Sequence, residues 1–153
     1  MKTQRNGGAA PEPGSARAAR PATPSELGAR SRASLGSRRL RIDVRRETGG
    51  IVQIRVSGEL DMIGAPHLRT RLHEEMARCR ALVLDLGGVD FLGTDGLSTL
   101  LDAGRQAEAD DVRWGIVATR HAVTHPLQAV GLQDVLPLHA SVDGATTAVT
   151  SAD

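Results

Sequence analysis

The chain has 153 residues and a formal net charge of +1, and this near neutrality conceals two oppositely charged parts. The first 40 residues carry eight Arg or Lys and two Glu, a net charge of +6, whereas the rest carries 11 bases and 16 acids. No apolar run reaches the ~18 residues that a membrane span needs, and a single cysteine excludes an internal disulfide. We therefore expect one domain, in the cytoplasm and without membrane insertion.

Residues 1–39 are a basic tail rich in Pro, Ala, Gly and Arg. We predict that this tail is disordered, because it has almost no large apolar side chains whose burial could offset the entropy of ordering. Its charges are spread out and no aromatic residue lies among them, so we expect a solvated tail with no direct contact to nucleic acid. A transit peptide is a weaker alternative, since Leu27 and Leu35 alone would have to supply its apolar face.

The folded domain is predicted over residues 40–153. Residues 40–47 and 51–56 have strand patterns on either side of the turn Gly49-Gly50, which favours an antiparallel pair at a sheet edge. A helical stripe follows, with Cys79 as a packed side chain at its end and Pro66 tolerated in its first turn. The apolar positions of this stripe are Ala65, Leu68, Leu72, Met76 and Cys79.

Residues 81–86 form a nearly continuous apolar run that ends at Gly87-Gly88, as expected for a buried strand. A helix is predicted from residue 95, with Thr94 as a suitable cap residue. We expect its buried face to hold Leu97, Leu100 and Leu101.

Residues 112–118 predict a further strand, which carries Trp114. Pro126 predicts that the next helix begins near residues 124–126 or is kinked there, because proline breaks a backbone hydrogen bond inside a helix. The alternation of strands and helices after residue 64 predicts an α/β fold. Its sheet is expected to be mostly parallel, with the antiparallel pair at one edge and helices covering it.

The turn Gly93-Thr94-Asp95-Gly96 joins the buried strand to the helix. In α/β folds, ligands and partners dock at such turns because the helix start presents free N–H groups and the positive end of its dipole. Asp95 also fits a purely structural role, since an acid in the first helical turn interacts favourably with the dipole.

Two clusters were considered as chemical sites. His121 and His125 have the i, i+4 spacing of a zinc-binding pair, but no third ligand is in view and we expect an exposed pair. Asp85, Asp90 and Asp95 resemble the acidic residues of a receiver domain.

A receiver also needs a lysine on a later strand, and Lys2 is the only lysine in the chain. We therefore predict that Asp85 caps a loop. No hydrolase elbow or phosphate-binding Gly-rich loop is present, so we predict no catalytic residue, metal or cofactor.

Three segments together resemble the STAS domain, which occurs in anti-sigma factor antagonists and at the cytoplasmic ends of sulfate transporters. The first contains Asp85-Leu86, Phe91-Leu92 and Gly96-Leu97, and the others are Gly58-Glu59-Leu60-Asp61 and Ala129-Val130-Gly131-Leu132. They occur in the family's order across residues 40–153. The resemblance implies a STAS-like fold.

The resemblance also implies a function. In anti-sigma factor antagonists a partner kinase phosphorylates the hydroxyl residue just before the motif's Gly. Asp95 occupies that position here, with Thr94 as a possible acceptor. A carboxylate cannot replace serine as a stable phosphoacceptor, so the switch is expected to be permanently set.

The family role implied is a non-catalytic antagonist that binds an anti-sigma factor of the ATPase/kinase fold and regulates sigma-factor-dependent transcription. An alternative is a STAS docking subunit of a stress-signalling or transporter assembly. The expected partner-binding residues are Asp61, Gly93, Thr94, Asp95, Gly96 and Ser98.

Overall fold

The structure, a computed structural model, describes residues 39–151, so the predicted disordered tail lies, apart from residue 39, outside the described residues. Five strands form one sheet in the order in which they occur along the chain. The strands are β1 (Arg41–Glu47), β2 (Ile51–Leu60), β3 (Ala81–Leu92), β4 (Arg113–Val117) and β5 (Leu138–His139). The helices are α2 (Ala65–Met76), α3 (Thr94–Ala109), α4 (His121–Ala129) and α5 (Val142–Thr150), with a 3-10 helix, η1 (Leu132–Asp134), after α4.

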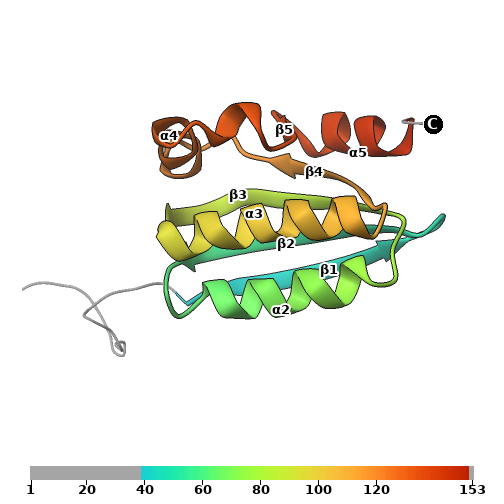
Figure 1. Cartoon of the computed structure of the whole chain (residues 1–153), viewed down its shortest axis with the longest axis horizontal. Helices are drawn as coiled ribbons and strands as arrows, with labels where there is room; N and C mark the ends of the chain where they lie inside the picture. The colour runs from blue at the N-terminus through green and yellow to red at the C-terminus, as the bar shows by residue number, and fades with distance from the viewer. Residues whose placement is uncertain (1–38, 152–153) are drawn as a thin grey trace, which may run out of the picture. The chain divides into compact units, whose positions relative to one another are not determined.

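The sheet confirms the predicted fold class. β1 pairs antiparallel with β2, and β2 to β5 run parallel to one another. The four parallel strands therefore end at the same edge of the sheet, which we call the carboxyl edge. α2 and α3 both begin at this edge and lie side by side (Figure 1).

Alternating side chains of β3 build a hydrophobic core on each face of the sheet. Leu82, Leu84 and Leu86 belong to the larger core, which also receives buried residues of α2, α3 and α4. Ala81 and Val83 point to the other face, where they pack against buried residues of α5. Burial on both faces explains why the β3 sequence is continuously apolar rather than alternating.

β2 and β3 are both longer than predicted, by four and six residues respectively, and the ranges 51–56 and 81–86 cover only their first parts. Glycines at 58, 87 and 88 indicated strand ends, whereas the two strands continue to pair through register shifts near these glycines. At Gly88 a Cβ would lie 2.7 Å from Cβ of Ser57, so the close approach of the strands requires glycine there. Gly58 has φ +98°, a conformation that side chains disfavour.

α3 differs from the prediction in its first residue and in its buried face. It begins at Thr94 rather than 95, and Gly93 is the cap residue, so Thr94 is not the cap. Leu100 is fully buried as predicted, while Leu97 and Leu101 are only half-buried. Thr99 is buried in their place, and its hydroxyl donates to the Asp95 carbonyl at 2.9 Å, so its one polar side-chain atom is satisfied.

α4 begins at His121, so the first of the two predicted alternatives, a start near residues 124–126, is wrong, while a kink at Pro126 stays a prediction. Pro126 lies inside the helix. The first turn forms because the N–H groups of Val123 and Thr124 both donate to the Arg120 carbonyl. A proline at this point removes the hydrogen bond that residue 126 would have donated to residue 122, and its ring crowds the carbonyl of that residue.

Candidate docking site

The amino end of α3 is fixed on the last residue of β2. The Gly93 N–H donates to the Leu60 carbonyl at 3.0 Å. At Gly96 a Cβ would lie 2.6 Å from Cδ1 of Leu92 and 3.0 Å from both Cβ and the carbonyl oxygen of Leu60. Because any side chain at residue 96 would collide with these buried groups, glycine allows the helix to begin directly against β2.

Asp61 orders the turn between β2 and α2. Its Oδ1 accepts from the N–H groups of Ile63 at 3.0 Å and Gly64 at 2.7 Å, and its carbonyl accepts from Ala65 N–H at 2.9 Å. This is an Asx turn, in which a short carboxylate takes over acceptor positions that water would otherwise fill. Asp61 follows Leu60 directly, so the structure brings this turn and the amino end of α3 together at the carboxyl edge.

The predicted site residues differ in what they offer to a partner. Thr94, Asp95 and Ser98 are exposed at the start of the helix. Gly96 is buried and Gly93 half-buried, so these two glycines set the position of the backbone. The Asp95 carboxylate lies in the first turn of α3, at the positive end of the helix dipole.

Three exposed apolar residues around this turn were not predicted as site residues. We call Met62, Ile63 and Phe91 the apolar rim, and their exposed fractions are 75%, 73% and 49%. Met62 and Ile63 lie in the Asp61 turn, and a Cβ at Gly93 would lie 3.0 Å from the Phe91 ring. Two features of the sequence could have indicated these residues. Phe91 is the only Phe in the chain, and Met62 and Ile63 lie just before the helical stripe rather than within it.

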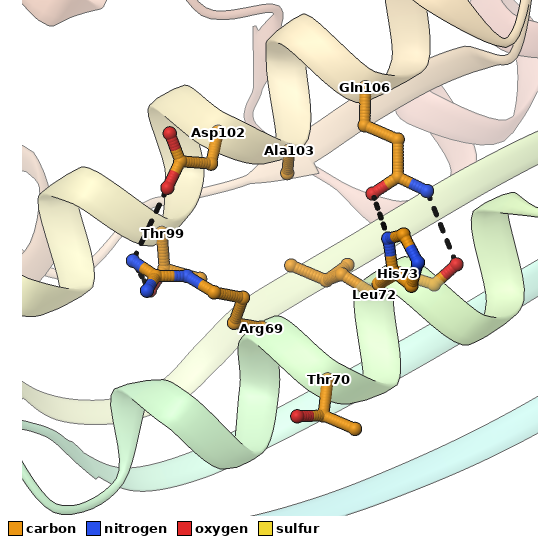
Figure 2. Close-up of a pocket in the computed structure, with 8 residues that line it drawn as sticks. All are labelled: Arg69, Thr70, Leu72, His73, Thr99, Asp102, Ala103 and Gln106. Carbon is orange, nitrogen blue, oxygen red and sulfur yellow. Dashed lines mark hydrogen bonds and ion pairs between the residues drawn. The ribbon is translucent and has the colours of Figure 1, made fainter.

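A hollow of about 340 Å³ lies between α2 and α3, and several of its polar side chains contact one another across it (Figure 2). Arg69 contacts Asp102 at 3.3 Å and Thr99 at 3.4 Å. Farther along the helices, Gln106 Nε2 donates to the His73 carbonyl at 3.2 Å. These pairs bridge the two helices, so we assign them a structural role.

The three aspartates considered for a receiver site have separate roles. Asp85 Oδ1 accepts from Gly87 N–H at 2.9 Å, which confirms its predicted local capping role. Asp90 pairs with Arg120 at 3.0 Å, and Asp95 is exposed on α3. The three carboxylates thus have different surroundings.

The histidine pair and the cysteine also match their predicted structural roles. His121 and His125 are exposed, and their rings stack with centroids 4.8 Å apart. Within residues 39–151, no three His, Cys, Asp or Glu side chains are grouped to hold a metal ion. Cys79 packs against the main core, and burial, together with the nearby Glu75 carboxylate, raises the pKa of its thiol.

Fold and site together define a class: an α/β domain that presents a helix start and apolar side chains at the carboxyl edge of its sheet. Comparison with protein-family profiles matches residues 44–145 to the STAS domain. The chain belongs to the STAS domain family. No helix in the described part of the chain is long and apolar enough to cross a membrane.

Similar proteins include several anti-sigma factor antagonists. The anti-sigma-F factor antagonist RsfB of Mycobacterium tuberculosis is 33% identical over 101 residues, which cover 65% of this chain and 82% of that protein. A crystal structure of an anti-sigma factor antagonist from Mycobacterium paratuberculosis is 34% identical with a TM-score of 0.67, covering 73% of this chain and 95% of that one. SpoIIAA in its unphosphorylated form has a TM-score of 0.63 and 20% identity, over 74% of this chain and 99% of that one, which supports the fold alone.

Proposed function

We propose that this protein is an anti-sigma factor antagonist: a non-catalytic domain that binds an anti-sigma factor of the ATPase/kinase fold and thereby regulates sigma-factor-dependent transcription in the cytoplasm. The names of its similar proteins, at 33% and 34% identity, support this role. Binding through the carboxyl edge needs neither a metal nor a cofactor.

The observation that carries the proposal is the apolar rim beside the accessible amino end of α3. Exposed Met62 and Ile63 lie in the turn after Leu60, and the Leu60 carbonyl accepts from Gly93 N–H. Exposed Phe91 precedes Gly93, and the exposed polar residues Thr94, Asp95 and Ser98 follow it. Partner interfaces typically combine a central apolar cluster with a polar surround, and aromatic residues are enriched among the strongest contacts. In the proposed complex, the apolar rim would be buried against the partner, and the polar residues at the helix start would fix the partner's orientation.

Asp95 then acts as a fixed charge at the position where family members carry a phosphoserine. Phosphoserine brings a charge of about −1.5 to −2 and three acceptor oxygens, whereas Asp brings one charge and two oxygens. Asp95 therefore mimics the phosphorylated, released state incompletely. Burying its exposed carboxylate against a partner without a cation opposes association, because the lost hydration is not replaced.

The partner is tested by affinity purification of the full chain from its own cells, followed by mass spectrometry. We expect recovery of an anti-sigma factor with an ATPase fold by the wild type and its loss with Phe91→Ser. Val130→Ser is the matched control, because Val130 is also exposed, at 58%, but lies at the end of α4. Recovery of transporter or stress-complex subunits instead, or equal loss with both variants, would contradict the proposal.

The role of Asp95 is tested by calorimetric titration of the wild type, Asp95→Ala and Asp95→Ser against the recovered partner. We expect both variants to bind more tightly, by about 1 to 3 kcal/mol, the scale of an unsatisfied buried polar group. Weaker binding by Asp95→Ala would show instead that the partner supplies a cation and that Asp95 is a recognition residue.

A further inference from the structure

A buried carboxylate lies at the other edge of the sheet, near the end of α2 and the start of β2. Glu75 is 1% exposed. Its Oε2 lies 2.5 Å from Nη2 of Arg46 and 3.6 Å from Nη2 of Arg78. Its Oε1 is buried and has no hydrogen-bond partner among the described residues. A buried acceptor without a donor is exceptional in folded proteins, so the two ion pairs do not fully account for Glu75.

Glu75 lines a hollow of about 380 Å³, which we call the amino-edge hollow. Its other lining residues include a second carboxylate, and the full set is Arg46, Glu47, Gly50, Ile51, Val52, Arg78 and Cys79. This volume falls within the range of small-molecule pockets. The side chains of Arg46 and Arg78 are 56% and 65% exposed, so they can shift toward a ligand and uncover Oε1 without disturbing the core.

The chemistry of the hollow restricts its ligand. A guanidinium has five N–H donors, and the contacts of Arg46 and Arg78 described above engage only one oxygen of Glu75. Two neighbouring guanidiniums match the several oxygens of a phosphate group. Oε1 requires a donor, and a ligand hydroxyl supplies one.

We propose that the amino-edge hollow binds a hydroxylated phosphate ester, whose phosphate contacts Arg46 and Arg78 and whose hydroxyl donates to Oε1 of Glu75. Cys79 forms part of the wall, and its raised pKa favours the neutral thiol over the reactive thiolate. The hollow lies about 15 Å along α2 from the first residue of that helix, which adjoins the candidate docking site. The hollow is therefore separate from the candidate docking site, and this proposal does not rest on the proposed anti-sigma function.

The test is a titration of the full chain with ribose 5-phosphate. Binding is measured from the chemical-shift changes of the backbone amide signals in two-dimensional NMR spectra. We expect saturable shifts at Gly50, Ile51 and Cys79, and none at Thr94 and Asp95. Inorganic phosphate and ribose, which each supply half of the chemistry, should bind at least tenfold more weakly. Adenosine 5′-monophosphate as a further probe distinguishes a nucleotide from a simple sugar phosphate, according to which binds more tightly.

The variants separate a built site from general attraction of anions. Glu75→Gln should weaken ribose 5-phosphate binding about tenfold, the effect of losing a charge-assisted hydrogen bond, and Glu74→Gln is the matched control on an exposed neighbour. Arg46→Gln, on an edge strand, tests the phosphate contact if Glu75→Gln fails to fold. The proposal is overturned if no probe shifts the three amides. It is also overturned if inorganic phosphate binds as tightly as ribose 5-phosphate, or if the variants of Glu75 and Arg46 bind like the wild type.

Discussion

Asp61→Ala should destabilise the domain through one turn, and the effect can be worked out from two hydrogen bonds. The Asp61 carboxylate accepts from the N–H groups of Ile63 and Gly64. Ile63 is exposed, so water can replace the first bond, whereas Gly64 is buried and its N–H would be left without a partner. An unsatisfied buried donor costs about 1 to 3 kcal/mol. For a domain of this size, that corresponds to a fall in Tm of about 4 to 12 °C.

Asp61→Asn is the informative control, because its side-chain oxygen still accepts both hydrogen bonds while its charge is lost. Thermal unfolding followed by circular dichroism should give a Tm within about 2 °C of wild type for Asn and the larger fall for Ala. If Asp61 acts by holding Met62 and Ile63 in place, Asp61→Asn should bind the proposed anti-sigma partner about as well as the wild type, and Asp61→Ala should bind it more weakly. A wild-type Tm for Asp61→Ala would refute this reasoning, and loss of binding with an intact Tm for Asp61→Asn would assign the charge to the partner contact.

Three further outcomes are expected. Leu100→Ala should lower the free energy of unfolding by about 2 to 5 kcal/mol in urea titrations, and Leu101→Ala by less than half of that, because only Leu100 is fully buried. Incubation with the proposed kinase-like partner and ATP should leave Thr94 unmodified in mass spectra, because the Thr94 hydroxyl is turned by about 100° on the helix relative to the family position. Stoichiometric phosphothreonine at residue 94 would contradict this. Cys79 should react with iodoacetamide at neutral pH more slowly than free cysteine and accelerate on unfolding, because burial and Glu75 raise the pKa of its thiol, and an unchanged rate would contradict this.

The sequence predicted the order and type of the main elements because their apolar patterns are long and regular. The continuous run at residues 81–86 and the helical stripe from Ala65 both lie where expected. The ends of β2 and β3 could not be predicted, because glycine at 58 and 88 suggests a turn in any local reading. Only the contact of Gly88 with Ser57 on the neighbouring strand shows that glycine continues the ladder there.

The candidate site was predicted in its polar part and missed in its apolar part. Thr94, Asp95 and Ser98 follow from the position of a helix start, which local sequence marks well. Met62, Ile63 and Phe91 were missed because an apolar residue is ordinarily assigned to the core, and exposure depends on packing that a single sequence does not reveal. Thr99 shows the converse error, a polar residue buried because a backbone carbonyl satisfies it.

Leu60 explains why the two halves of the candidate site act as one unit. Its carbonyl accepts from Gly93 N–H, Gly96 packs on it, and Asp61 follows it in the chain. A shift of the amino end of α3 would therefore have to break the contact with β2 that also positions the turn bearing Met62 and Ile63. Packed backbone contacts of this kind resist gradual deformation. In the proposed complex, the charge at Asp95 would therefore act directly on the surface that the partner meets, and a permanent carboxylate there would set the affinity without a change of fold.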